Sequence, residues 1–291
     1  MQLALGTVQL GMPYGIANAQ GMPDEQTAVE ILCAAHECGM RWIDTAAAYG
    51  VSEATLGRAL PQAWSGAAPQ IATKFVLDEN TAPAAQLDAA LEKLRRDRIE
   101  ALLLHRETDI DHPRFAEFAA LAQSGRVESV GVSIYAPQIA LRGLEAGLHC
   151  LQVPLNLFDT ASIDAGVLKK ASEAGARVFV RSIFLQGLFF LKPDHPRAQA
   201  IPGASTALAA LHAFCQKHAV EPQTLALAFG AFLGEDTVIV LGAENAAQVR
   251  SNAALATEAE KQRELAARWL RERPAIPPNV TNPGTWQRAA P

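Results

Sequence analysis

Two side chains that can do chemistry stand close together in WIDTAAAYG, residues 42–50, where an apolar run ends at Asp44 and Tyr49 follows. A phenol is a weak acid at neutral pH, and a neighbouring ammonium lowers its pKa from the ordinary value of about 10. Lys74 is a candidate for that ammonium, and Asp44 for the carboxylate that keeps it charged. His105 can orient a substrate oxygen. The four side chains predict a proton donor beside a polarised carbonyl, to whose carbon a hydride can be delivered.

Each of these residues also has an ordinary structural interpretation. A single aspartate after a strand often caps a loop, a single tyrosine often packs, and a histidine after the apolar run ALLL often sits satisfied in a core. Lys74 also suits a Schiff base, since aldolases on barrel folds place a lysine at a strand end. The occurrence of all four at successive strand ends favours the proton-donor hypothesis, because the aldolase leaves Asp44 and Tyr49 unexplained.

The elements that must position these residues are short apolar runs separated by polar loops and helix-like stretches. The runs cover residues 3–8, 40–46, 69–75, 99–106, 127–133, 148–154, 176–182 and 236–242, and clear helical periodicity covers 24–39, 82–97 and 162–176. Alternating strands and helices indicate parallel pairing, and continuous apolar runs indicate strands covered on both faces. At 291 residues, eight such units predict an α/β fold, a single-domain (β/α)8 TIM barrel over residues 1–272.

A doubly wound sheet is the alternative architecture. It requires a glycine fingerprint after the first strand, but Gly6, Gly11 and Gly15 lack the G-x-G-x-x-G spacing. The remaining residues, 273–291, are rich in proline and contain Trp286, so we expect an extended C-terminal tail rather than a helix. That tail either frays or folds over the barrel mouth.

In a barrel of this kind, reactive groups gather at the C-terminal ends of the strands. The polar residues at the predicted strand ends are Asp44, Lys74, His105, Ser133, Gln152, Asn156, Arg181 and Ser182, with Tyr49 just beyond the second strand. We therefore expect all of these side chains to face one common mouth.

Composition limits the classes of function. The chain is 49% hydrophobic and 19% charged, which is typical of a soluble globular protein with a large core. The net charge of −5 is spread without like-charged blocks, so neither a nucleic-acid surface nor a basic membrane helix is indicated. No apolar run reaches the ~18 residues of a membrane span, and the first residues lack signal-peptide features, so we expect a cytoplasmic protein. The cysteines, Cys33, Cys38, Cys150 and Cys215, have no zinc-type spacing, and no metal is expected.

The motifs resemble those of the aldo-keto reductase family along nearly the whole chain. The matching segments are LGTVQLG (5–11), IDTAAAYGVSEATLG (43–57), ATKF (72–75), LLLHRE (102–107), GVS (131–133), LQVPLN (151–156) and RSIFLQGL (181–188). The resemblance implies a (β/α)8 barrel, NADP(H) or NAD(H) as coenzyme, and reduction of a carbonyl to an alcohol. It also implies a catalytic tetrad of Asp44, Tyr49, Lys74 and His105, with the tyrosine as acid.

The resemblance further implies a coenzyme site. Ser133, Gln152 and Asn156 correspond to residues around the nicotinamide, Ser182, Leu185 and Gly187 to a pyrophosphate loop, and GAENAAQVRSN (242–252) to the adenosine-binding turn and helix. The full set expected to bind the coenzyme is Gly6, Thr7, Ser133, Gln152, Asn156, Arg181, Ser182, Leu185, Gly187, Gly242, Ala243, Glu244, Gln248 and Asn252.

Three positions depart from the family pattern. Arg181 replaces an aromatic residue that stacks on the nicotinamide, although a guanidinium plane can also stack on a ring. Ile134 replaces an asparagine after Ser133. Glu244 replaces a basic or small polar residue that meets the 2′-phosphate of NADP(H), and a carboxylate there repels that phosphate and can bond a free ribose hydroxyl. Because Arg250 can compensate, the sequence leaves NAD(H) and NADP(H) both open.

The expected function is an NAD(P)H-dependent reductase of a small aldehyde, ketone or sugar. The alternative is a nicotinamide-nucleotide-binding regulator with little or no turnover; Arg181 and Ile134 favour it and the intact tetrad opposes it. Tyr14, Arg106 and Trp286 are candidate substrate contacts, and Arg106 either holds an anionic substrate or pairs with Glu107. Nothing in the sequence indicates an oligomeric state.

Overall fold

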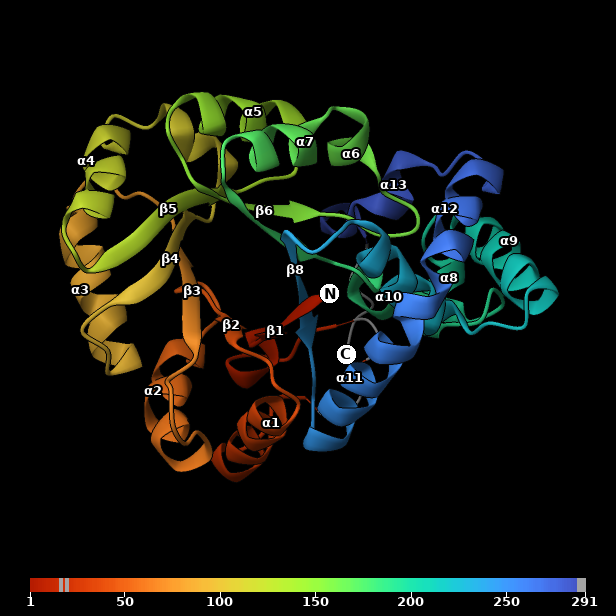
Figure 1. Cartoon of the computed structure of the whole chain (residues 1–291), viewed down its shortest axis with the longest axis horizontal. Helices are drawn as coiled ribbons and strands as arrows, with labels where there is room; N and C mark the ends of the chain where they lie inside the picture. The colour runs from red at the N-terminus through yellow and green to blue at the C-terminus, as the bar shows by residue number, and fades with distance from the viewer. Residues whose placement is uncertain (16–17, 19–20, 287–291) are drawn as a thin grey trace.

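Eight parallel strands close into a barrel in sequence order in a computed structural model that describes residues 1–15, 18 and 21–286 (Figure 1). The strands are β1 Gln2–Gly6, β2 Trp42–Asp44, β3 Gln70–Phe75, β4 Ile99–Leu104, β5 Val127–Ser133, β6 Cys150–Pro154, β7 Arg177–Arg181 and β8 Thr237–Gly242. Each lies within, or within one residue of, a predicted apolar run. The predicted (β/α)8 barrel is confirmed. The doubly wound alternative is wrong, because β1 pairs with both β2 and β8.

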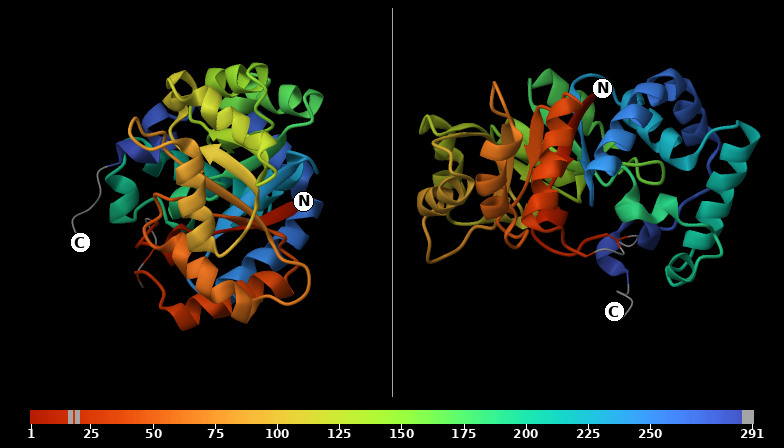
Figure 2. Two further views of the ribbon diagram at one scale, coloured as in Figure 1. Left: turned by 90° about the vertical axis from the view of Figure 1, so that its left-hand side faces the viewer. Right: turned by 90° about the horizontal axis from the view of Figure 1, so that it is seen from below.

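Helices surround the barrel, and additional ones lie to one side (Figures 1 and 2). They are α1 Glu25–Glu37, α2 Ser52–Ala63, α3 Pro83–Leu94, α4 Phe115–Ala119, α5 Pro137–Glu145, α6 Ala161–Asp164, α7 Val167–Glu173, α8 Pro196–Gln199, α9 Ala204–Lys217, α10 Pro222–Phe232, α11 Ala246–Ala259, α12 Arg263–Glu272 and α13 Pro278–Thr281. Asp24 caps α1 by accepting a bond from the Thr27 amide, and Gly39 ends the turn after it at φ 72°. Over the part of the chain that is described, no helix is both long enough and apolar enough to cross a bilayer.

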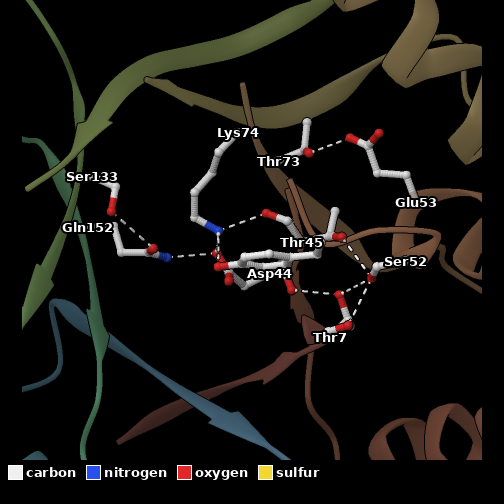
Figure 3. Close-up of polar contacts among 10 residues, drawn as sticks. Thr7, Asp44, Thr45, Ser52, Glu53, Thr73, Lys74, Ser133 and Gln152 are labelled. Atoms are coloured by element: carbon white, nitrogen blue, oxygen red, sulfur yellow. Dashed lines mark hydrogen bonds and ion pairs between the residues drawn. The ribbon is translucent and has the colours of Figure 1, made fainter. Parts of the chain in front are cut away.

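Side chains along each strand point alternately into the barrel and out toward the helices. On β3, Thr73 donates outward to Glu53 of α2 at 2.7 Å, while the next residue, Lys74, reaches inward to Asp44 (Figure 3). A separate interior cluster consists of Ala4, Trp42, Ala72, Ala101, Leu103, Cys150, Phe179 and Val238. Its alanines leave room for the rings of Trp42 and Phe179, whose centroids are 4.9 Å apart, and the Arg177 guanidinium covers Trp42 at the N-terminal side.

The same alternation determines which residues reach the mouth. Two positions beyond Trp42, Ala72, Leu103, Cys150 and Phe179, the inward-facing register carries Asp44, Lys74, His105, Gln152 and Arg181. An apolar layer in the middle of the barrel therefore supports a polar layer at its C-terminal end.

The tail after α12 differs from the predicted extended segment. It contains the single turn α13 and a 3-10 turn at Pro283–Thr285, because prolines at the first positions of both turns already have helical φ angles. The Arg273 guanidinium donates to Leu157 O at 2.7 Å, so the start of the tail is bound to the loop after β6. Residues 287–291 of the predicted tail lie outside the described residues.

Helices α2 and α3 pack closely enough to require a glycine between them. A Cβ added to Gly57 would lie 2.1 Å from the main-chain oxygen of Lys93. On α5, the three atoms nearest to a Cβ added to Gly143 would all be side-chain methyl carbons, of Leu148 and Val132 at 3.3 Å and of Ile110 at 3.9 Å. Substitution of Gly143 is therefore a suitable control for substitution of Gly57, because both glycines are helical and only Gly57 lies against main chain.

We expect Gly57→Ala to lower the free energy of unfolding by about 2 kcal/mol, because overpacking outweighs the better helix propensity of alanine. Gly143→Ala is expected to stay within about 1 kcal/mol of the parent chain. Urea unfolding followed by circular dichroism measures both. Equal stability of the two variants would contradict the close contact between α2 and α3.

Candidate active site

The buried ammonium of Lys74 is the centre of the site (Figure 3). Its Nζ donates to Asp44 Oδ1 at 2.7 Å and to the main-chain oxygen of Thr45 at 2.7 Å, and it lies 3.5 Å from Tyr49 Oη. Lys74 has no exposed surface, so its three donors are committed to these groups. The structure therefore brings together the predicted Asp44, Lys74 and Tyr49 by direct contacts.

His105 completes the group from the next strand. Its ring lies 5.6 Å from the Tyr49 ring, centroid to centroid, in an edge-to-face arrangement. Burial, together with the smaller effects of the positive charges of Lys74 and Arg181, lowers the pKa of His105 to about 4. The imidazole is therefore neutral at physiological pH and can donate a hydrogen bond without competing with Tyr49 as an acid.

The pKa of Tyr49 depends on its burial as well as on the predicted effect of the Lys74 ammonium. Burial raises the pKa of Tyr49 above 10, and the opposing effect of the Lys74 ammonium is smaller, so the net lowering expected from the sequence is wrong. Burial also lowers the pKa of Lys74, but Asp44 and Tyr49 more than offset that effect and the pKa is raised. Tyr49 is thus held protonated and Lys74 charged across the physiological range.

The loop that carries Tyr49 is fixed by main-chain packing that the sequence did not reveal as part of the site. A Cβ on Gly11 would lie 1.7 Å from Tyr49 O, and one on Gly50, which has φ 57°, would lie 2.3 Å from Gly11 O. Side chains at either glycine are incompatible with this approach. The loops after β1 and β2 therefore interlock beside the phenol.

A cluster of buried hydroxyls supports the same loops. Thr7 Oγ1 donates to Asp44 O at 2.9 Å and lies 2.8 Å from Ser52 Oγ, which in turn contacts Thr45 Oγ1 at 3.0 Å (Figure 3). The hydroxyl of Thr7, expected at the coenzyme, thus faces the strand end that carries Asp44. Gly6, beside it, occupies the inward position at the end of β1. Ser52 and Thr45 had no distinguishing sequence signal, because single hydroxyl residues are common.

The residues expected around the nicotinamide lie on the opposite side of the mouth. Gln152 Nε2 donates to Asp44 Oδ1 at 2.7 Å, and Ser133 Oγ lies 3.4 Å from Gln152 Oε1. Asn156 is fully buried, its Oδ1 accepts from the amides of Phe158 and Asp159, and its Nδ2 has no hydrogen-bond partner. A buried donor without a partner is costly in a folded protein, so Asn156 has hydrogen-bonding capacity left for a ligand.

Arg181 packs against a residue that the sequence did not single out. Its Cζ lies 4.3 Å from the centroid of the Tyr135 ring, and its Nη2 donates to Ile134 O at 3.0 Å. The guanidinium therefore extends from β7 across to the loop after β5. No sequence motif singles out Tyr135, which is the aromatic residue two positions beyond Ser133.

The loop after β7 has an unusual main chain. Ser182, Leu185, Gln186 and Gly187 have φ angles of 64°, 49°, 53° and 93°. Three of these residues are not glycine, and each costs free energy in the left-handed region. Such a backbone directs amide groups into a concave surface, which is typical of anion-binding loops.

The turn after β8 is ordered by its own side chains. The Glu244 amide donates to Gln248 Oε1 at 2.8 Å, and the Gln248 amide donates to Asn245 Oδ1 at 3.0 Å, which caps α11. Gly242 and Ala243 precede this turn, and Asn252 lies further along α11. Arg250 points away to α1, where it pairs with Glu37 at 2.8 Å. Its expected compensation for Glu244 is therefore not present in this arrangement.

The three candidate substrate contacts have different surroundings. Arg106 pairs with Asp109 at 2.6 Å, not with Glu107, whose carboxylate accepts bonds from the amides of Tyr135 and Ala136. Trp286 donates from Nε1 to Asn279 O within the tail, and Tyr14 lies on the exposed loop after β1. Exposed large apolar side chains recur in the loops that follow strands: Met12, Tyr14, Met22, Val51, Val76, Tyr135 and Phe190.

The arrangement places a protonated phenol, a neutral imidazole and a buried ion pair together at one end of the barrel. The described residues contain no group of three or more His, Cys, Asp or Glu side chains suited to a metal ion. A phenol next to an ammonium and a neutral imidazole can protonate an oxygen that develops negative charge. Fold and site together define a barrel protein equipped for acid-assisted chemistry at its C-terminal mouth.

Comparison with known proteins identifies the family. Residues 2–269 match the model of the aldo/keto reductase family. Aldo-keto reductase YhdN of Bacillus subtilis (strain 168) is 27% identical over 202 residues, covering 64% of this chain and 59% of the relative. An aldo-keto reductase of Mycobacterium sp. (strain KMS) is 34% identical over 122 residues, covering 40% and 44%. This chain thus belongs to the aldo-keto reductase family, although the alignments span less than two thirds of these relatives.

Solved structures agree in fold. Glycerol dehydrogenase AKR11B4 from Gluconobacter oxydans superposes with a TM-score of 0.71 at 25% identity, covering 94% of this chain and 93% of that protein. The holo form of aldo-keto reductase AKR11C1 from Bacillus halodurans gives a TM-score of 0.75 at 21% identity, covering 97% and 95%. At such identities these likenesses support the barrel and not a particular substrate.

We predict that the His105 ring titrates near pH 4 and not near 6.5. In a proton NMR titration, the C2–H signal that disappears in His105→Gln should move only below about pH 5. Since the folded-state pKa is below the unfolded value, the unfolded chain binds the proton first. Stability that depends on His105 is therefore present above about pH 6.5 and lost as the pH falls toward 4. A midpoint between pH 6 and 7 would contradict the burial of this imidazole.

Proposed function

We propose that this protein is an NAD(P)H-dependent oxidoreductase that reduces the carbonyl of an aldehyde, ketone or sugar to an alcohol, with Tyr49 as the proton donor. The observation that carries the proposal is the position of Lys74 Nζ, bonded to Asp44 and 3.5 Å from Tyr49 Oη in a layer that faces the barrel mouth. Membership of the aldo-keto reductase family supports the reaction class.

In the proposed reaction, a bound nicotinamide coenzyme supplies the hydride that reaches the carbonyl carbon. His105 donates a hydrogen bond that orients the carbonyl oxygen, and Tyr49 transfers its phenolic proton to that oxygen as negative charge develops. The phenolate left on Tyr49 is stabilised by Lys74, whose charge is maintained by Asp44. Uptake of a proton from solvent then restores Tyr49.

Several features of the chain fit a dinucleotide. Asn156 Nδ2 is a buried donor without a partner, and the loop of Ser182, Leu185 and Gly187 has the left-handed backbone of an anion site. The capped N-terminus of α11 adds a favourable field for negative charge. We assign the nicotinamide end to Ser133, Gln152, Asn156 and Arg181, and the adenosine end to Gly242, Ala243, Glu244, Gln248 and Asn252.

We further propose that NAD(H) is preferred to NADP(H). Glu244 places a carboxylate at the turn before α11, where the family commonly meets the 2′-phosphate. The one basic side chain of α11, Arg250, is paired with Glu37 and does not neutralise it. A carboxylate near a phosphate is repulsive, whereas it accepts a hydrogen bond from a ribose hydroxyl.

Removing the Tyr49 hydroxyl should abolish most turnover and spare coenzyme binding. For Tyr49→Phe we expect kcat to fall by about 10²- to 10⁴-fold, because the general acid is lost. The Kd of the coenzyme, followed by protein fluorescence, should change by less than about threefold, because the ring and its packing remain. Turnover is the loss of 340 nm absorbance with a panel of aldehydes, quinones and sugars.

This turnover assay, together with coenzyme binding and borohydride trapping, decides between the alternative functions. Undiminished turnover in Tyr49→Phe would exclude the phenol as the acid. Tight coenzyme binding by the parent chain with no turnover on any carbonyl would favour the nicotinamide-binding regulator. Trapping of a substrate on Lys74 by borohydride would favour the lysine aldolase.

The coenzyme proposal is tested by Glu244→Gln, which keeps the shape of the side chain and removes its charge. We expect kcat/KM for NADPH relative to NADH to rise by about tenfold, because a like-charge repulsion is removed. Arg250→Gln is the matched control on the same helix and should leave the ratio unchanged. A preference for NADPH in the parent chain would refute the proposal.

A further inference from the structure

A hydrogen bond from Gln152 to Asp44 crosses the barrel mouth. Asp44 ends β2 and Gln152 lies on β6, and in the closed order β1 to β8 these strands are four apart in either direction. They therefore stand on opposite walls. The Nε2–Oδ1 distance is 2.7 Å, and both residues are at most 3% exposed, so the contact is a buried link between the two walls (Figure 3).

We propose that Gln152 is a positioning residue for the proton donor: through Asp44 it fixes Lys74 beside Tyr49, in addition to any contact it makes with the coenzyme. This inference rests on the proposed function, because it assigns a role within the same site. Gln152 acts here through another residue and does not itself exchange a proton.

The chemistry of the two groups fixes the orientation of the Gln152 amide. An ionised carboxylate only accepts hydrogen bonds, so the NH2 group of Gln152 must face Asp44 and its oxygen must face Ser133. Gln152 Oε1 is thus presented as an acceptor on the side expected to hold the nicotinamide. One amide therefore joins the coenzyme side of the mouth to the carboxylate that controls Lys74.

The bond from Gln152 restrains the same oxygen of Asp44 that accepts from Lys74. Asp44 Oδ1 receives both Gln152 Nε2 and Lys74 Nζ, each at 2.7 Å. Lys74 lies 3.5 Å from Tyr49 Oη, at the long end of a hydrogen bond, so a small displacement of Asp44 removes that contact. Without Gln152, the Asp44 side chain keeps only its bond to Lys74, so a shift of the carboxylate is passed to Lys74, which is then restrained by Thr45 O alone.

The isosteric variant Gln152→Glu turns this link into a pH-dependent one. Its carboxyl donates to Asp44 only when protonated, and the Asp44 charge raises its pKa above the ordinary 4.3. At low pH the link is kept; as the pH rises through that pKa, two carboxylates oppose each other beside Lys74. We expect kcat of the variant to fall by at least about tenfold as the pH rises through this pKa, which adds a new descending limb to the pH profile of kcat. The coenzyme Kd should change by less than about threefold, because an acceptor oxygen remains.

Other groups around position 152 do not obscure this limb. Gln152 contacts Asp44, which is paired with Lys74, and the other charged or titratable side chains that interact with this pair or with its neighbours are Tyr49, His105, Cys150, Arg181 and Glu53, the last from the outer side of β3. The pKa of His105 is lowered to about 4, that of Cys150 is raised to about 12, and those of Lys74 and Tyr49 are raised. A new transition between pH 5 and 9 in the variant therefore reports on position 152.

Two further variants separate positioning from coenzyme contact. Ser133→Ala removes the outer partner of Gln152 and keeps the bond to Asp44, so the coenzyme Kd should rise and kcat should gain no new pH dependence between pH 5 and 9. Gln152→Leu removes the donor at every pH, so kcat should fall about tenfold without a new limb. A parental pH profile in Gln152→Glu, or a parental kcat in Gln152→Leu, overturns the proposal.

A readout without turnover distinguishes failure of this proposal from failure of the proposed function. The unfolding midpoint of Gln152→Glu, relative to the parent, should fall as the pH rises from about 5 to 8. The sign follows because a carboxyl with a raised folded-state pKa loses its contribution on deprotonation. Absence of turnover in the parent with this midpoint shift refutes the reductase but keeps the link between Gln152 and Asp44. Absence of the shift refutes the link even when the parent is active.

Discussion

The site depends on the burial of one charge. Lys74 has no exposed surface, and an unpaired ammonium in that position would be too costly to keep. Asp44 makes the charge tolerable, and removing one member of such a buried pair typically costs about 3–5 kcal/mol. The pair therefore constrains the fold and the chemistry together, since the arrangement that keeps Lys74 charged is also the one that places it beside Tyr49.

The barrel makes this burial possible through the period of its strands. Inward positions alternate with outward ones, so the layer of Trp42, Leu103 and Phe179 excludes water beneath the layer of Asp44 and Lys74. A low-dielectric floor strengthens each interaction above it and raises the cost of any unpaired polar group. Because unpaired polar groups are costly here, Lys74 Nζ bonds Thr45 O as well as Asp44, and Asp44 also accepts from Gln152.

Most of this fold could be predicted from the sequence, because apolar runs and helical stretches depend on local periodicity. The convergence of Asp44, Tyr49, Lys74 and His105 was also predictable, since strand ends in a parallel barrel meet whatever their separation in the chain. The contacts of Gly11 with Tyr49 and of Arg181 with Tyr135 were not, because they depend on loop paths that no local pattern specifies. The net pKa of Tyr49 was wrongly predicted for a related reason: burial is a property of the whole packed structure.

The two sides of the mouth are built by different physical means. On the side of β1 to β4, rigid packing of Gly11 against Tyr49 and the hydroxyls of Thr7 and Ser52 fix the loop of Tyr49 without any ligand. On the side of β5 to β8, a buried donor of Asn156 has no partner and the loop after β7 is strained, features that a bound molecule can satisfy. One side is therefore rigid before any ligand binds, and the other retains an unsatisfied polar group and a strained loop. Gln152 is the residue through which the two sides meet.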